Sequence, residues 1–204
     1  MLEKIAMKFS RKAYVESLLP PPGEGARLHL GCGDIHLEGW VNVDARETSA
    51  TDLVEDVFDL PTRAKNSTSA IYACHILEHC GLPSNCAMPS YQFVLSRWFS
   101  ALKPGGVLLV SVPDLMTIFK GLKHYDGHDG QLGFLLALFG GQNYVGNTHY
   151  CGFTNRSLHR ALESVGFRSV RPFRPFVDDT SAFVLSGFPI SLNLAARKPE
   201  TVSG

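Results

Sequence analysis

The segment that most limits the possible folds is one apolar run, residues 106–112 (GVLLVSV). It is apolar enough to be buried on both faces of a strand, which is typical of a parallel sheet covered on both sides. The residues before it, 91–102, carry apolar side chains at helical spacing, and the breakers Lys103–Gly106 separate the two elements. A helix that leads into a doubly buried strand indicates an open α/β sheet.

Short apolar strands and helical patterns alternate from residue 26 onward. Strands are expected at residues 27–30, 40–44, 52–57, 70–74, 106–112, 167–173 and 190–197. Besides 91–102, a helix is expected after Thr154 as N-cap, with Gly166 at its C-terminus. A separate helix at 4–18, stopped by Pro20–Pro22, is expected to flank the main sheet as a lid.

The ends of the first two strands carry residues that suit a nucleoside. Open α/β sheets bind their ligands beyond the carboxyl ends of the strands. Gly31-Cys32-Gly33 follows the first strand, and glycines allow a backbone to approach a ligand closely. Asp44 ends the second strand, where a carboxylate can accept hydrogen bonds from both ribose hydroxyls.

The next two strand ends extend this pattern. Asp56, Val57 and Phe58 offer an acceptor, a backbone N–H and an apolar surface, which are the three features that an adenine ring needs. Cys74-His75 follows the fourth strand. Each feature alone is common turn chemistry. Together, at four successive strand ends, they predict a nucleoside site.

A nicotinamide dinucleotide fits the sequence less well. Its G-x-G-x-x-G fingerprint requires a third glycine where this chain has His36. It also requires an acidic residue about 20 positions further along, whereas Asp44 comes 13 positions after Gly31. Both differences argue against a dinucleotide site.

An ordered set of short motifs resembles one enzyme family. The set runs through LHLGCG (28–33), GWVNVD (39–44), DLP (59–61), LEH (77–79), LKPGG (102–106) and VPD (112–114), and continues through GGQ (140–142), HY (149–150), FT (153–154) and GF (166–167). It is similar to the S-adenosylmethionine-dependent methyltransferases of the type 11 group, and more closely to a compact, mostly bacterial branch with a GWxNVD second strand. The resemblance covers about residues 26–173.

The resemblance implies a fold, a cofactor and a reaction. The implied fold is α/β, with a Rossmann-like, seven-stranded, mostly parallel sheet that is flanked by helices and has its last strand antiparallel. The implied cofactor is S-adenosylmethionine, with the glycine loop at its methionine part, Asp44 at the ribose, and Asp56 and Val57 near the adenine. Cys74 is expected to complete this cofactor site.

The sequence departs from the family pattern in two places. The family usually has an acidic residue where this chain has His29, so one contact to the amino group of the cofactor is in doubt. Only eight or nine residues join the first two strands, whereas a parallel crossover normally takes a dozen or more. We expect a loop or a single helical turn there, which leaves that side of the cofactor more open.

The motif His75-x-x-Glu78-His79 gives an alternative interpretation, because it matches the inverted zinc-peptidase motif. Cys74, Cys80 and Cys86 could add ligands. A zinc hydrolase, however, requires both histidines on one helix face, and the motif begins at the exit of an apolar strand. We therefore assign no metal to the site from the sequence.

Methyl transfer requires alignment of the reacting groups and, for a hydroxyl acceptor, a general base. His75 and His149 are the candidate catalytic residues, with His79 and Glu78 as third choices. For His75 and His149, a hydrogen-bonded structural histidine is an equally good interpretation. Residues 116–151 are interpreted as an insertion that covers the active site and selects a small polar acceptor, with a sugar or metabolite hydroxyl favoured.

The bulk properties fit one domain of 204 residues, divided into an N-terminal segment (1–22), a cofactor half (26–113) and an acceptor half (114–204). Nineteen basic residues balance nineteen acidic ones, which argues against extended nucleic-acid binding. No segment reaches the roughly 18–20 apolar residues of a membrane span. The start lacks signal-peptide features, and five cysteines without a CxxC pair indicate a reduced, cytoplasmic protein.

Two further points stay open at this stage. A methyltransferase-like module that binds the nucleoside but only regulates or scaffolds would retain the same glycines and aspartates. The oligomeric state has no signal in the sequence.

Overall fold

Seven strands form one sheet in the computed structural model, which describes residues 13–60, 65–83, 88–144 and 146–200. The strand order is β3-β2-β1-β4-β5-β9-β6. The strands are β1 (Ala26–Leu30), β2 (Val41–Asp44), β3 (Leu53–Val54), β4 (Thr68–Cys74), β5 (Leu102–Pro113), β6 (Arg168–Pro172) and β9 (Ser191–Arg197). Strands β1 to β5 pair in parallel, and β9 lies antiparallel between β5 and β6. The predicted seven-stranded sheet with an antiparallel last strand is confirmed.

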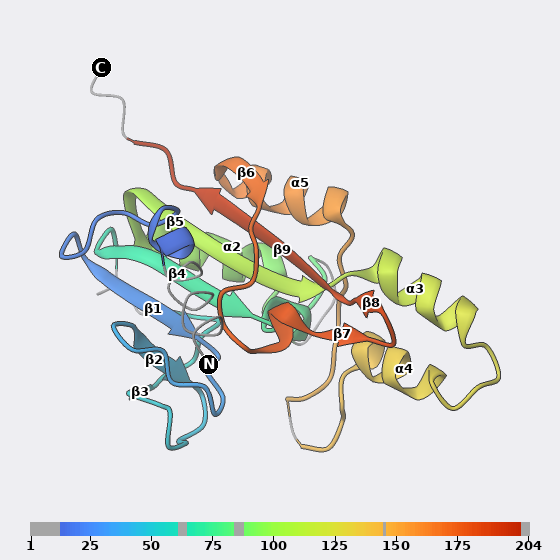
Figure 1. Ribbon diagram of the computed structural model, residues 1–204. Helices are drawn as coiled ribbons and strands as arrows, with labels where there is room; N and C mark the ends of the chain where they lie inside the picture. The colour runs from blue at the N-terminus through green and yellow to red at the C-terminus, as the bar shows by residue number, and fades with distance from the viewer. Residues whose placement is uncertain (1–12, 61–64, 84–87, 145, 201–204) are drawn as a thin grey trace.

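Helices α2 to α5 and a short hairpin accompany this sheet in the described part of the chain (Figure 1). They are α2 (Tyr91–Ala101), α3 (Leu115–His124), α4 (Gln131–Phe139), α5 (Asn155–Val165), and the strands β7 (Val184–Leu185) and β8 (Phe188–Pro189). Two 3₁₀ turns, η2 (Leu77–His79) and η3 (Thr180–Ala182), lie near the carboxyl ends of the sheet strands. Across the described residues, no helix combines the length and the apolar character that crossing a membrane requires.

The central strands are buried on both faces. All seven residues of β4 are buried, and their side chains alternate between two cores. Helices α2 and α5 cover one face, where Trp98 and Leu162 pack with Ile71. The other face is covered by helical residues 13–16 with the loops 35–40 and 173–177. Of the expected helix at 4–18, residues 4–12 lie outside the described part of the chain.

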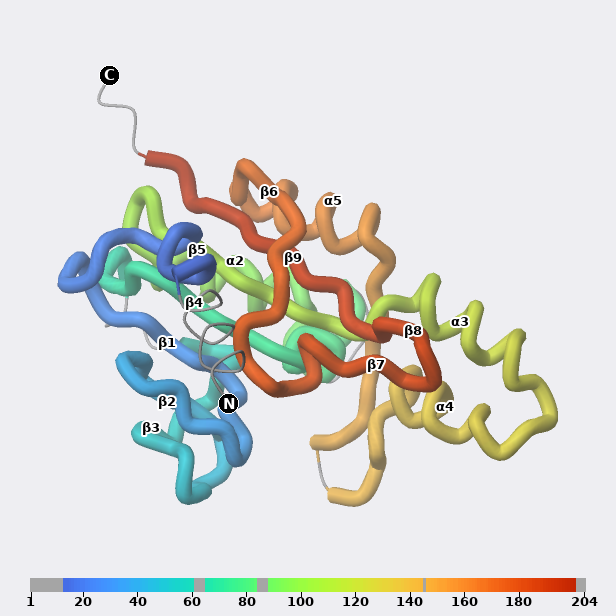
Figure 2. The backbone as a smooth tube through the Cα atoms, viewed as in Figure 1, coloured from blue at the N-terminus to red at the C-terminus, as the bar shows by residue number. Residues whose placement is uncertain are grey.

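A third, smaller core holds the segment between β5 and α5 in place. Ile118 of α3, Phe134 of α4 and Ile190 beside β8 form its buried centre. A side chain at Gly121 would meet the Phe134 ring, so this glycine allows α3 and α4 to pack closely. After α4 the chain runs back to the start of α3, where Phe153 O accepts from Leu115 N. Figure 2 shows the path of the backbone through this segment.

In the first half of the sheet, one expected strand is shorter in the structure, and one expected connection is as predicted. The third strand was expected at 52–57 but pairs only at Leu53–Val54, because the chain turns at Asp56, whose Oδ1 accepts from Phe58 N. The connection from β1 to β2 contains turns and no helix, as expected from its length.

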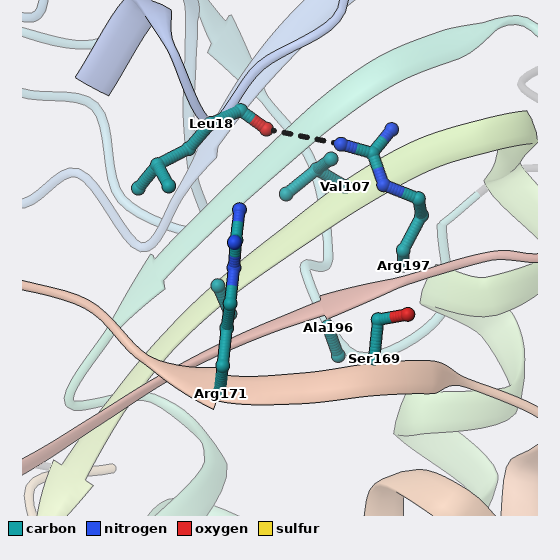
Figure 3. A pocket seen from close by; sticks show the side chains of 7 residues that line it. Leu18, Val107, Ser169, Arg171, Ala196 and Arg197 are labelled. Carbon is teal, nitrogen blue, oxygen red and sulfur yellow. Dashed lines mark hydrogen bonds between the residues drawn. The ribbon is translucent and has the colours of Figure 1, made fainter. Parts of the chain in front are cut away.

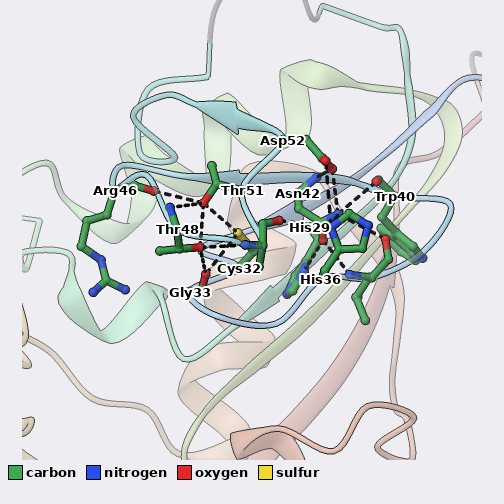
Figure 4. Close-up of polar contacts among 12 residues, drawn as sticks. His29, Cys32, Gly33, His36, Trp40, Asn42, Arg46, Thr48, Thr51 and Asp52 are labelled. Atoms are coloured by element: carbon green, nitrogen blue, oxygen red, sulfur yellow. Dashed lines mark hydrogen bonds and ion pairs between the residues drawn. The ribbon is translucent and has the colours of Figure 1, made fainter.

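A polar network takes the place of a helix in this connection (Figure 4). The Asn42 side chain is fully buried; its Oδ1 accepts from Leu37 N and its Nδ2 donates to Asp52 Oδ2, both at 2.8 Å. Asn42 N also donates to Asp52 Oδ2, and these donors hold the pKa of Asp52 below its usual value. One amide side chain therefore joins the loop, β2 and the start of β3.

His29 extends this network into the core and makes the fold sensitive to acid. Its Nδ1 lies 3.0 Å from Asn42 Oδ1, and its ring stacks on Tyr72. Burial lowers the pKa of His29, although the Asn42 hydrogen bond and the nearby Asp179 and Asp44 act in the opposite direction.

We expect the unfolding free energy to fall as the pH is lowered from 7 towards 5, through His29. The unfolded chain binds a proton near pH 6.5 that the folded chain resists, so this contribution is present above that pH and is lost below it. The slope for one such group cannot exceed about 1.4 kcal/mol per pH unit. Urea denaturation of wild type, His29→Gln and His29→Phe at each pH tests this. The gap between wild type and either variant should narrow on acidification, and a gap independent of pH would contradict it.

Candidate functional site

A cavity of about 750 Å³ lies beyond the carboxyl ends of β1, β2 and β4. Ten residues that the sequence singled out line it, namely Gly31, Gly33, Asp44, Asp56, Val57, Phe58, Cys74, His75, His79 and His149. They come from separate strand ends and from the segment before α5, and they meet because parallel strands end at the same edge of a sheet.

The glycine loop has a backbone that glycine tolerates best. Gly31 and Gly33 have φ values of 65° and 54°, in the left-handed region. Gly31 N donates to Val43 O, which continues the pairing of β1 with β2. A Cβ on Gly31 would lie 1.9 Å from Ile76 Cδ1, so only glycine leaves room for Ile76 at the cavity wall.

Cys32 differs from the two glycines around it. Its side chain is 3% exposed and does not line the cavity. Its Sγ lies 3.7 Å from Thr51 Oγ1, under the loop (Figure 4). Burial raises the pKa of this thiol. The side chain therefore supports the loop from below, and only the backbone of this residue can reach a ligand.

Backbone donors orient the Asp44 carboxylate towards the cavity. Gly33 N donates to Oδ2 at 2.8 Å and Arg46 N donates to Oδ1 at 2.9 Å. Each carboxylate oxygen can accept more than one hydrogen bond, so both retain capacity for a ligand hydroxyl.

The 56–58 turn is anchored from below by a helix. Trp98 Nε1 of α2 donates to Val57 O at 2.8 Å, and both groups are buried. This bond fixes the Val57 peptide and leaves the exposed Asp56 carboxylate at the cavity rim. Phe58 adds an apolar side chain to the same wall.

Cys74 ends β4 and contacts the η3 turn, which also lines the cavity. Its Sγ is 3.2 Å from Thr180 Oγ1 of η3. Burial raises the pKa of the Cys74 thiol to about 12, so the group stays protonated and unreactive near neutral pH. The η3 turn is itself fixed by the sheet, because Tyr72 Oη donates to Asp179 Oδ2 at 2.5 Å.

His75 has an unusual backbone and two engaged ring nitrogens. Its φ is 54°, a strained value for a residue other than glycine that is found mainly at functional sites. Its Nε2 lies 2.8 Å from Ser191 Oγ, whose own proton goes to Thr180 O at 2.5 Å. Nε2 is therefore the donor, and Nδ1 faces Glu78 Oε1 at 3.2 Å.

Glu78, His79 and His149 form a compact group beside His75. Glu78 is fully buried, and its Oε1 lies 3.9 Å from His149 Nε2. The rings of His79 and His149 meet edge to face, with centroids 4.8 Å apart. Both rings also contribute to the cavity wall.

The electrostatics of this group depend on its burial. Burial alone would raise the pKa of Glu78, but His75, His79 and His149 outweigh it and hold that pKa below its usual value. Burial lowers the pKa of His149, with Glu78 acting against it. We therefore describe Glu78 as a carboxylate enclosed by imidazoles.

The second wall of the cavity comes from the segment that was interpreted as an insertion. Its lining residues are Gly133, Leu136, Ala137, Gly140, Gly141, Tyr144, Gly146 and Asn147, joined by Thr180, Phe183, Leu185 and Ile190. The Arg46 guanidinium lies 4.9 Å from the Tyr144 ring centroid, which links the two walls.

Several of these residues were not found from the sequence. Arg46 follows Asp44 by two positions, and a charged residue so close to a predicted strand end was an available signal. Thr180 and Ser191 had none, because they reach Cys74 and His75 only through the folded sheet.

A second hollow, of about 300 Å³, lies away from this edge (Figure 3). Arg171 and Arg197 line it with Leu18, whose carbonyl accepts from Arg197 Nη2 at 3.5 Å. It is bounded by β6, β9 and the beginning of β5, and none of the predicted site residues reaches it. The large cavity is therefore the candidate site.

Comparison with known proteins gives a fold and no family. No family model matches the chain, and no curated protein matches it by sequence. A methyltransferase from Archaeoglobus fulgidus that depends on S-adenosylmethionine superposes with a TM-score of 0.58 at 16% identity, covering 95% of this chain and 93% of that one.

Two further structures broaden this comparison. The Burkholderia thailandensis 1,6-didemethyltoxoflavin-N1-methyltransferase, which contains S-adenosylhomocysteine, has a TM-score of 0.55 at 17% identity over 96% of this chain and 79% of that one. The CurJ carbon methyltransferase has a TM-score of 0.56 at 15% identity over 95% and 54%. The chain thus has the Rossmann-like fold of S-adenosylmethionine-dependent methyltransferases.

We expect Gly31→Ala to destabilise the fold more than Gly39→Ala. Both positions have positive φ, which costs roughly 1–2 kcal/mol for alanine, but a Cβ on Gly39 meets nothing within 4 Å. The additional loss at Gly31 reflects the clash with Ile76, and Ile76→Ala in the Gly31→Ala background should recover part of it. Urea denaturation of the four proteins measures this. Equal losses at the two glycines would refute the steric argument.

Proposed function

We propose that the chain is a methyltransferase that uses S-adenosylmethionine to methylate a small polar acceptor. The observation that carries this proposal is the convergence of Gly31, Gly33, Asp44, Asp56 and Val57 on one cavity, within a fold shared with such enzymes. We also assign the chain to the type 11 group, on the GWxNVD motif and the ordered motifs around it.

The cavity wall near β1 to β3 suits an adenosyl group. Asp44 would accept from the ribose hydroxyls, because its oxygens are oriented by Gly33 N and Arg46 N and keep free lone pairs. Asp56 and Val57 would accept from and donate to the adenine edge, with Phe58 against the ring. When bound, S-adenosylmethionine would supply an activated methyl group on its sulfonium.

The opposite wall would bind the acceptor. It combines apolar side chains, such as Leu136 and Phe183, with the amide of Asn147 and the imidazole of His149. This mixture suits a small molecule with a hydroxyl group. The toxoflavin methyltransferase, whose structure holds its small-molecule substrate, supports an acceptor of this size.

The two candidate catalytic histidines would have different roles. His75 is engaged at both nitrogens, by Ser191 and Glu78, so we assign it a positioning role. His149 donates from Nδ1 to Ala137 O at 3.2 Å, which leaves the lone pair on Nε2. We assign His149 the direct contact with the acceptor hydroxyl.

We keep a reduced, cytoplasmic setting as part of the proposal. Among the described residues, Cys32, Cys74 and Cys80 are buried free thiols, which suits a reducing compartment.

We expect Asp44→Asn to weaken binding of S-adenosylhomocysteine by about tenfold or more, because hydrogen bonds to a charged acceptor contribute roughly 1.5–3 kcal/mol. Asp59→Asn is the matched control, since Asp59 is exposed, pairs with Arg97 and does not line the cavity. Titration calorimetry measures both. Wild-type protein that binds neither adenosyl ligand would overturn the proposal.

We expect His149→Ala to lower turnover about 100-fold or more, with the affinity for S-adenosylhomocysteine unchanged. The control is His159→Ala, on the exposed side of α5. Turnover is measured as S-adenosylhomocysteine released in the presence of a panel of hydroxylated small molecules. Cofactor binding without turnover on any acceptor would favour the scaffold alternative over an enzyme.

A further inference from the structure

Three side chains beside the second wall of the cavity form a candidate metal centre. Glu78, His79 and His149 each offer one ligand atom, and these three atoms lie within 4.8 Å of one another. They come from η2 and from the segment that leads into α5, two parts of the chain joined where Glu78 O accepts from Tyr150 N. The group is thus assembled by tertiary structure and not by one helix.

The hydrogen bonds of the two histidines prepare their other nitrogens for a ligand. His79 Nδ1 lies 3.0 Å from Thr148 O, and His149 Nδ1 lies 3.2 Å from Ala137 O. A carbonyl oxygen can only accept, so both Nδ1 atoms carry the proton and both Nε2 atoms carry a lone pair. Histidines that bind metals are usually fixed in this way, with the second nitrogen donating to a carbonyl or a carboxylate.

The Glu78 carboxylate provides a second, independent observation. The residue is fully buried, and within the described chain neither carboxylate oxygen accepts a well-formed hydrogen bond. A buried carboxylate without such partners is costly, since it loses its hydration with little in return. The nearest side chain that it faces is His75, whose Nδ1 lies 3.2 Å from Oε1, and this contact leaves Oε2 without a partner.

We propose that Glu78, His79 and His149 bind a divalent first-row transition-metal ion in the acceptor half of the cavity. Two imidazole nitrogens and one carboxylate are the donor set of catalytic zinc sites that keep a position open for water or substrate. Magnesium, which prefers oxygen ligands and retains water, fits this set less well. Zn²⁺ is the ion of best fit.

This site differs from the metal site that the sequence motif suggested. The inverted zinc-peptidase motif would use His75 and His79 from one helix. In the structure His75 precedes the 3₁₀ turn with a left-handed backbone, and its Nε2 is bound to Ser191. His149 takes the place of His75 among the three proposed ligands. His75 instead orients Glu78 through the contact between its Nδ1 and Glu78 Oε1.

The catalytic use of the ion rests on the proposed methyl transfer, whereas the binding of the ion does not. A metal ion held by these residues would lower the pKa of an acceptor hydroxyl, whose proton would pass to solvent water. The C–O bond would then form as the S–CH₃ bond of the sulfonium breaks, and S-adenosylhomocysteine would leave. The ligand role of His149 then replaces direct contact between His149 and the acceptor. The acceptor class narrows to molecules that present an oxygen to the metal.

The test is metal binding by the purified, tag-free protein after treatment with a chelator and its removal. Calorimetry with ZnCl₂, and the visible absorption of added Co²⁺, report affinity, stoichiometry and ligand type. We expect one ion per chain, and at least about tenfold weaker binding in Glu78→Gln, His79→Ala and His149→Ala. We also expect Mg²⁺ to bind far more weakly than Zn²⁺.

A matched control is available on the surface. His159 and Glu163 of α5 form an exposed pair with 3.3 Å between Nδ1 and Oε2, so His159→Ala with Glu163→Gln removes the same residue types without touching the cavity. This variant should bind Zn²⁺ as the wild type does. Glu78→Gln keeps the size of the buried side chain, and the histidine variants serve if it does not fold.

Three results would overturn the inference: wild type without Zn²⁺ or Co²⁺ uptake at about 1 mM, ligand variants that bind like wild type, or equal affinity for Mg²⁺. The same proteins are titrated with S-adenosylhomocysteine. Metal uptake without nucleoside binding would remove the proposed methyl transfer and leave the metal site. Nucleoside binding without metal uptake would remove the metal site and leave the proposed methyl transfer.

Discussion

The whole cavity depends on the burial of β4 and β5 on both faces of the sheet. Strands that are buried on both faces offer no surface to a ligand along their length, so the residues that face the cavity lie at the strand ends. The parallel direction of β1, β2 and β4 brings those ends to one edge. Residues far apart in sequence, such as Gly31, Asp44 and His75, thereby line one cavity.

Backbone donors and acceptors orient three of the polar side chains at this edge. Gly33 N and Arg46 N orient Asp44, while Thr148 O and Ala137 O orient two imidazoles. Backbone groups cannot change with the side-chain sequence, so this geometry follows from the chain path alone. Such preorganisation is what a site for transferring a group between two bound molecules requires.

Much of the sheet, and the residues at the ends of its first four strands that line the cavity, could be predicted because their signals are local. Apolar runs mark β4 and β5, so the ends of these strands were identifiable before any contact was known. The breakers Lys103–Gly106, which were expected to separate a helix from a strand, instead lie within β5. The acceptor wall carries weaker signals. Thr180 and Ser191 matter only because η3 and β9 bring them to Cys74 and His75. Of the three imidazoles around Glu78, His75 and His79 are neighbours in sequence, and His149 joins them through contacts across about 70 residues.

The separate core of Ile118, Phe134 and Ile190 has a consequence for how the molecule can change. Because this core shares none of its buried centre with the two cores of the sheet, opening of α3, α4 and the β7–β8 hairpin would disrupt one small core and leave the packing of the sheet in place. The same separation lets the unit be repacked by substitution while the sheet stays intact. The packing of the second cavity wall is therefore separable from the packing of the sheet.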